Sequence, residues 1–295
     1  MPTTDLGVDD AGPQGSDAPQ ADHIRFLFDP AHTLALLIGH RRRFGATVAA
    51  LTDEELAALS RCRGWTVADV LRHDVWVDAT IRRIWSGDGA TLRGFDPRVT
   101  PDESVRADRA VPDREVVARY LSSTEAMITE LERVDPARYG DPSRSPAGRV
   151  PWWLSAVHVG WDSTIHERDV LVPLGRTVEE QSGEAPVWLA YSLVLASFFE
   201  PGRFDVAVGG VRLRRGDGPV TVCLSEPQAT SQGTTHGTAG RAIDGTTPQP
   251  TILRGDPVAV VDAVSGRVPL GAALHGDPSD VERLGGLARY FGEAG

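Results

Sequence analysis

Four titratable side chains share one face of a predicted helix in the middle of the chain. They are His158, Asp162, His166 and Asp169. A rotation of about 100° per residue brings these positions to the same side of a helix. Apolar residues accompany them at helical spacing, so the stripe is predicted to point inward, where imidazole and carboxylate groups need partners. Those apolar residues are Leu154, Val157, Ile165 and Val170.

Asp162 and His166 are four residues apart, and neighbours at this spacing can bind one cation. A third candidate ligand, His73, comes from an earlier segment. Thr66 and Asp69 have the spacing of a capping box, so a helix is predicted to begin at Thr66 with His73 about two turns inside it. A histidine from that helix would complete a set of two histidines and one carboxylate with open coordination positions.

Each of these residues also has an alternative structural interpretation. His73 and His166 could be core histidines that are satisfied by Asp69 or Asp169, and Asp162 could form an ordinary buried ion pair. His158 could be a ligand or substrate contact, or a packed neighbour of the group.

Asp169 is predicted to lie behind the ligands, where it would orient a ligand imidazole. Its alternative interpretations are a helix cap or a partner of Arg168. Cys62 is expected to be a small buried apolar residue, unless its thiol reaches the site.

The motifs that contain these residues resemble a known family. Cys62-x-Gly64-Trp65-Thr66-Val67-x-Asp69-Val70-x-x-His73 is followed by acid-x-x-x-His-x-x-Asp over residues 162–169. This order is similar to that of the mycothiol-dependent maleylpyruvate isomerase family. The segments 264–267 and 274–277 resemble its small C-terminal domain, so the resemblance spans roughly residues 25–293.

The resemblance implies an α+β protein with two domains after a disordered tail over residues 1–21. A DinB-type four-helix bundle would occupy residues 22–178, and a sterol-carrier-like α/β domain residues 186–295. By position, the family's metal ligands fall on His73, Asp162 and His166, with Asp169 as the partner in His-x-x-Asp. Several relatives have Glu where this chain has Asp162. The implied cofactors are a divalent metal, for which nitrogen and oxygen ligands favour zinc, and mycothiol as the thiol cosubstrate.

An acidic substrate would need a cation opposite the metal. Arg267, in a Gly-Arg pair after a predicted helix, is the catalytic candidate from the C-terminal domain, because a guanidinium can bind a carboxylate with two hydrogen bonds.

Periodicity predicts the elements that position these residues. Helices are expected over residues 30–50, 51–60, 66–85, 113–134 and 151–174, with loops over residues 86–112 and 135–150. A helix over residues 187–200 precedes alternating strands over residues 204–224. A strand at residues 251–253, a helix at residues 257–264 and a terminal helix from Asp277-Pro278 complete the pattern.

Composition limits the function classes. The net charge of −11 excludes a typical nucleic-acid surface. No apolar run reaches the roughly 18 residues that a membrane span needs, and two cysteines give no disulfide framework, so a cytoplasmic, reduced protein is expected. All 30 basic residues are arginine, a bias typical of a GC-rich genome such as those of actinobacteria, which use mycothiol.

Three functions therefore stay open. The first is a mycothiol-dependent isomerase or S-transferase that acts on a small electrophile such as maleylpyruvate. The second is a metal enzyme that works without a thiol, such as a hydrolase or a tailoring enzyme of specialised metabolism. The third is a non-catalytic binding module.

Overall fold

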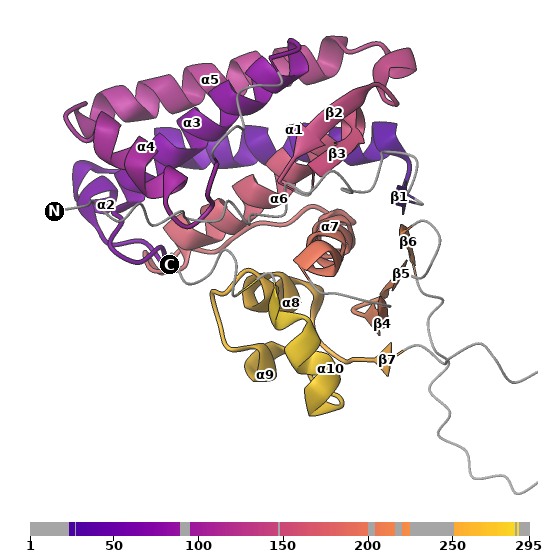
Figure 1. The fold of residues 1–295 in the computed structure, drawn as a ribbon. Helices are drawn as coiled ribbons and strands as arrows, with labels where there is room; N and C mark the ends of the chain where they lie inside the picture. The colour runs from indigo at the N-terminus through magenta and orange to yellow at the C-terminus, as the bar shows by residue number, and fades with distance from the viewer. Residues whose placement is uncertain are drawn as a thin grey trace, which may run out of the picture.

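The computed structural model describes residues 24–26, 28–88, 95–146, 148–199, 204–215, 220–224, 251–286 and 288. The predicted disordered tail over residues 1–21 lies outside this part of the chain. Figure 1 shows a layer of long helices above a smaller layer of strands and short helices. This architecture confirms the predicted fold class.

Four long helices form the upper layer. They are α1 (Pro30–Ala49), α3 (Val67–Trp85), α5 (Asp113–Arg133) and α6 (Trp152–Leu171). Helices α1 and α3 both pack against α5 and α6, and the four helices enclose two hydrophobic clusters. A short helix, α2 (Asp53–Ala57), joins α1 to α3. None of the helices in the described ranges has both the length and the apolar character that crossing a bilayer requires.

The start of α3 has the predicted capping box. The Thr66 hydroxyl accepts a hydrogen bond from the Asp69 amide, and the Asp69 carboxylate accepts one from the Thr66 amide, both at 3.2 Å. The two bonds satisfy backbone donors that the first helical turn leaves free. This start places His73 about two turns into α3, on the buried side.

Both predicted loops of the bundle contain regular structure. Helix α4 (Thr100–Asp108) lies within the first loop, and a hairpin of β2 (Pro142–Ser145) and β3 (Gly148–Pro151) lies within the second. Only Val105 of α4 is buried, so its sequence has almost no apolar period to reveal a helix. The hairpin strands have four residues each, and their pattern is correspondingly weak.

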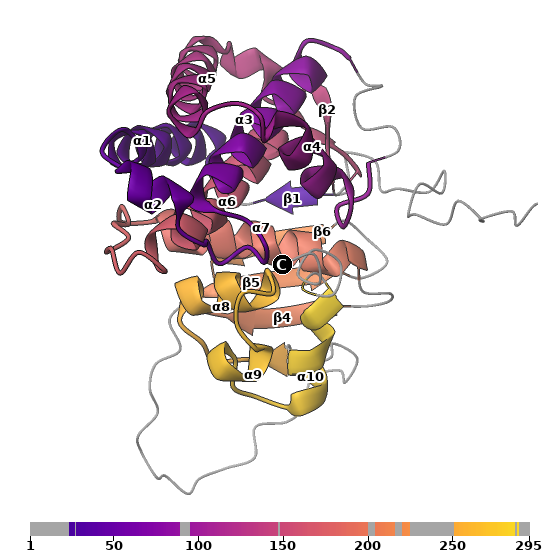
Figure 2. The same cartoon turned by 90° about the vertical axis from the view of Figure 1, so that its left-hand side faces the viewer.

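The lower layer is a five-stranded sheet with helices to one side of it (Figures 1 and 2). The sheet order is β1-β6-β5-β4-β7, where β4 (Phe204–Val208), β5 (Val211–Arg215) and β6 (Val220–Leu224) form an antiparallel meander. The added strand β7 (Thr251–Ile252) pairs in parallel with β4. The helices are α7 (Glu184–Phe199), α8 (Pro257–Val264), α9 (Leu270–Ala273) and α10 (Pro278–Arg283).

The strand β1 (Ile24–Phe26) joins the lower sheet although it precedes the bundle in sequence. Ile24 pairs with Val220 and Phe26 with Val222, in parallel. The predicted domain boundaries assign residues 24–26 to the bundle segment. The structure therefore links the two layers through the strand that leads into α1.

Helix α7 connects the two layers by packing against α6 above and against α8, β5 and β6 below. The contact with α6 is close at Gly160. A Cβ atom there would clash with Trp188 Cη2 and would lie 2.6 Å from Trp188 Cζ3. One hydrophobic core therefore runs from the bundle through α7 to the sheet, with Leu37 and Leu213 among its fully buried members.

Candidate metal centre

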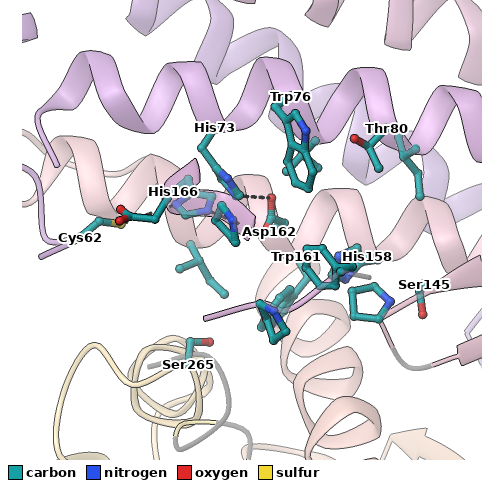
Figure 3. A pocket seen from close by; sticks show the side chains of 18 of the residues that line it. Cys62, His73, Trp76, Thr80, Ser145, His158, Trp161, Asp162, His166 and Ser265 are labelled. Atoms are coloured by element: carbon teal, nitrogen blue, oxygen red, sulfur yellow. Dashed lines mark hydrogen bonds and ion pairs between the residues drawn. The ribbon is translucent and has the colours of Figure 1, made fainter. Parts of the chain in front are cut away.

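The three predicted metal ligands meet between α3 and α6. His73 extends from α3, and Asp162 and His166 extend from α6 (Figure 3). The Nε2 atom of His73 lies 3.9 Å from Asp162 Oδ2, and Nε2 of His166 lies 3.7 Å from Asp162 Oδ1. Each residue offers one ligand atom, and these atoms all lie within 4.8 Å of one another.

This donor set fits a divalent cation. Distances of 3.7 and 3.9 Å are too long for hydrogen bonds, so the imidazole nitrogens face the carboxylate without bonding to it. Zinc binds histidine nitrogen and aspartate oxygen at about 2.0–2.2 Å, and small side-chain movements would bring all three atoms to such distances. His73 Nδ1 is buried and has no hydrogen-bond partner.

Burial and charge act against each other within this group. Burial and the neighbouring His166 lower the pKa of His73 to about 3. Burial alone would lower the pKa of His166, but the Asp162 carboxylate and a hydrogen bond to Asp169 raise it well above its ordinary value. Burial would raise the pKa of Asp162, but the imidazoles of His166 and His73 hold it below its usual range. The group thus holds one positive charge beside an ionised carboxylate, in the place where a cation would bind.

Asp169 lies behind His166, on the side away from Asp162. Its Oδ2 atom is 3.1 Å from His166 Nδ1, and its side chain is completely buried. Burial would raise the pKa of Asp169, but Arg267 and His166 hold it well below its usual range. An ionised carboxylate in this place accepts a hydrogen bond from Nδ1 and directs Nε2 of His166 towards Asp162, so a cation that displaced the Nε2 proton would find a ligand lone pair there.

Arg267 reaches Asp169 from the loop after α8. Its Nε and Nη2 atoms donate to the Asp169 carboxylate at 2.9–3.1 Å, and its Nη1 atom donates to the Ser265 carbonyl. The structure thus places Arg267 beside the metal ligands, but its donors are directed at Asp169. Its predicted contact with a substrate carboxylate would compete with these bonds.

Cys62 is buried, as the sequence predicts, but its thiol has polar neighbours. Its Sγ atom donates to Asp169 Oδ2 at 3.1 Å and lies 4.0 Å from His166 Nδ1 and 3.6 Å from Arg267 Nη2. A purely apolar role for Cys62 does not describe these contacts. The sequence signal was its position just before the capping box, which places Cys62 beside the N-terminal end of α3, near the site.

Arg61 and Asp262 complete the connection, and sequence reasoning did not select either residue. Arg61 donates to Asp169 at 3.0 Å and, with its two terminal nitrogens, to Asp262 of α8 at 2.9 and 3.0 Å. Asp262 also accepts a hydrogen bond from Arg168 of α6 at 2.7 Å. These ion pairs hold α8, α6 and the segment before α3 together beside the candidate metal ligands.

A cavity of about 140 Å³ opens next to the three ligands. Its walls are rich in aromatic side chains, and Trp76 of α3 stacks on Phe95 with ring centroids 6.2 Å apart. His158 lines the cavity beyond Asp162, outside the three-residue group, and stacks on Trp161 at 5.7 Å. Its Nδ1 atom is buried without a hydrogen-bond partner. The cavity could hold a small molecule against the ligand atoms.

The comparisons with known proteins agree with this arrangement. Residues 39–171 match the family described as Mycothiol maleylpyruvate isomerase N-terminal domain, a range that contains the three ligands and Asp169 but not Arg267. Crystal structures of the mycothiol-dependent maleylpyruvate isomerase and of a histidine-to-alanine mutant of it are similar in fold. Both give a TM-score of 0.51 at 10% sequence identity, covering 85% of this chain and 93% of theirs. No curated protein gives a significant sequence match. The resemblance inferred from the motifs is confirmed.

Proposed function

From the match of residues 39–171 to this family, we propose that the protein is a metal-dependent thiol enzyme. It binds one divalent cation, zinc, through His73, Asp162 and His166. It uses mycothiol to act on a small electrophile such as maleylpyruvate, as an isomerase or an S-transferase. The observation that carries this proposal is the convergence of three ligand atoms from two helices to within 4.8 Å, beside a cavity.

A divalent cation at this site would lower the pKa of a bound thiol and so supply a thiolate near neutral pH. The protein's own residues prepare the site for this role. Asp169 holds the Nδ1 proton of His166 and fixes the direction of its Nε2 atom. Arg267 and Arg61 pair with the Asp169 carboxylate and compensate its charge in the buried site.

The proposed reaction begins with addition of the thiolate to an activated carbon–carbon double bond. In an isomerase, addition leaves a single bond that can rotate, and expulsion of the thiolate restores the double bond in the other geometry. In an S-transferase, the adduct is protonated and released. The aromatic walls of the cavity would exclude water from the electrophile during either reaction.

Metal content tests the site directly. Elemental mass spectrometry on purified protein should find about one zinc per chain, and His166→Ala should lose it, because three protein ligands are the usual minimum for a catalytic zinc site. His32→Ala is the matched control, since His32 is exposed on α1, away from the ligands. Equal, negligible metal in all three proteins would refute the proposal.

Binding of mycothiol tests whether the protein uses this thiol. Mycothiol should raise the melting temperature of the zinc-loaded protein, because a ligand that binds only the folded state stabilises it. An unchanged melting temperature in protein that retains its metal would favour the thiol-independent alternative.

The proposed catalytic role of Arg267 needs its own variant. Arg267→Ala should lose turnover while it keeps zinc, and wild-type turnover in this variant would remove Arg267 from the mechanism.

A further inference from the structure

The cavity walls indicate which class of electrophile the site accepts. We infer that the preferred substrate is a neutral conjugated carbonyl compound with an apolar, aromatic substituent, which the cavity accepts in preference to a small dicarboxylate such as maleylpyruvate. This inference rests on the proposed thiol chemistry. The thiol sulfur would bond to the β-carbon of the substrate and the thiol proton would pass to the α-carbon, so the step needs no oxidant or reductant.

Apolar side chains from three directions form most of the cavity wall. Helix α3 presents one row of these residues, α6 a second, and the segment before α4 a third. They include Trp76, Val77, Ile81 and Ile84 from α3, Trp161 and Ile165 from α6, and Phe95 and Pro97 from the segment that leads into α4, with Pro101 in the first turn of α4. A planar aromatic group would find contact surface on Trp76 and Trp161 without any new polar partner.

The cations that line the cavity already have carboxylate partners. Among the described lining residues, the side chains that are always positively charged are those of Arg98 and Arg267. Arg267 donates from two nitrogens to Asp169, and its side chain is 11% exposed. Arg98 pairs with Asp96 at 3.3 Å, and its side chain is 60% exposed and therefore solvated.

Acidic side chains in the wall disfavour an anionic substrate further. Asp102 lines the cavity and accepts a hydrogen bond from Trp65 Nε1 at 2.8 Å. This bond and the one from Arg106 outweigh partial burial and hold the pKa of Asp102 below its usual range, so it is ionised. If His73, His166 and Asp162 held a divalent cation with both imidazoles neutral, the site would carry one net positive charge, which a bound thiolate would neutralise. A dicarboxylate would then lie in an apolar cavity without a free cation, and this is unfavourable.

Binding of unreactive analogues to the zinc-loaded protein tests the inference without turnover. Calorimetry should find 4-phenylbutan-2-one at least about tenfold tighter than succinate, since a tenfold ratio needs only modest apolar contact energy. Trp76→Ala should weaken binding of the ketone by about tenfold while zinc content stays unchanged. Thr80→Arg, which adds a cation to the wall, should strengthen succinate binding. Val172→Ala, on the exposed end of α6, should change neither ligand.

Tighter binding of succinate than of the ketone, or an unchanged ketone affinity in Trp76→Ala with zinc retained, would overturn the inference. Turnover separates this outcome from failure of the proposed function. Consumption of mycothiol with 4-phenylbut-3-en-2-one should exceed that with maleylpyruvate. A preference for maleylpyruvate would overturn the inference and leave the proposed function standing. If mycothiol were consumed with neither electrophile, the proposed function would be refuted. The affinities for 4-phenylbutan-2-one and succinate would then show which class of ligand the cavity binds.

Discussion

Replacing Gly160 by alanine should destabilise the protein, although the same change stabilises most helices. Gly160 lies in the middle of α6, where it faces Trp188 of α7. In an unobstructed helix, alanine is favoured over glycine by about 0.8–1 kcal/mol. Here the new Cβ atom would lie 2.6 Å from Trp188 Cζ3 and 3.3 Å from Leu37 Cδ1. The first distance is far inside van der Waals contact, and Trp188 is fully packed, so α6 and α7 must move apart.

The expected magnitude follows from the two opposing effects. Overpacking of a well-packed core costs about 1–3 kcal/mol, and the gain in helix propensity offsets up to about 1 kcal/mol of it. The free energy of unfolding of Gly160→Ala should therefore fall by up to about 2 kcal/mol. Gly45→Ala is the matched control, because its Cβ atom would meet Thr124 and Leu121 at 3.7 and 3.8 Å, which are ordinary contacts.

Urea unfolding followed by tryptophan fluorescence would measure both variants against the wild type. Gly45→Ala should be more stable than the wild type by up to about 1 kcal/mol. Both variants gain the same helix propensity, so they should differ by the overpacking cost of about 1–3 kcal/mol. Trp188→Phe should reduce the penalty of Gly160→Ala, since a smaller ring leaves room for the methyl group. If Gly160→Ala were as stable as Gly45→Ala, the close contact between α6 and α7 would not exist as described.

Two further substitutions test the buried charges. Asp169→Asn should lower the free energy of unfolding by about 3–5 kcal/mol in urea, because it leaves the buried Arg267 without its anion, while Arg61 keeps Asp262; a loss below 1 kcal/mol would contradict the role assigned to this carboxylate. Burial, together with Arg41, lowers the pKa of His40 to about 3, so the unfolded chain binds a proton near pH 6.5 and the folded chain does not. Stability should therefore fall by about 1.4 kcal/mol per pH unit below pH 6.5 from this group. His40→Gln should remove that part of the pH dependence between pH 7.5 and 5.5, and equal slopes in both proteins would show that His40 is not buried in its neutral form.

The bundle and the core of the candidate site were predictable because their signals are local. The capping box of Thr66 and Asp69 fixes the start of α3 and hence the position of His73. The spacing of Asp162 and His166 needs only the helical period to place both on one side of α6. Their meeting with His73 was predicted from ligand chemistry and supported by the family resemblance, since no local pattern states which helices are neighbours.

The missed features depend on contacts between distant segments. Nothing near Arg61 in the sequence indicates Asp262, which lies 201 positions later and forms its ion pair only after α8 has packed beside α6. The residue type of Cys62 predicts only a small apolar side chain, whereas the polar neighbours of its thiol, Asp169 and Arg267, come from two other segments. Helix α4 escaped prediction because a single buried side chain gives no period.

The pairing of β1 with β6 has a consequence for how the protein is made. Ile24 pairs with Val220, which is 196 residues further along the chain. Ribosomes add roughly 5–20 residues per second, so about 10–40 s pass between the synthesis of the two strands. During that time the helices that follow β1 can leave the ribosome and begin to pack, while the segment of β1 has no partner. The segment of β1 can therefore join the sheet as an edge strand only late in synthesis, and until then it needs protection from pairing with another chain.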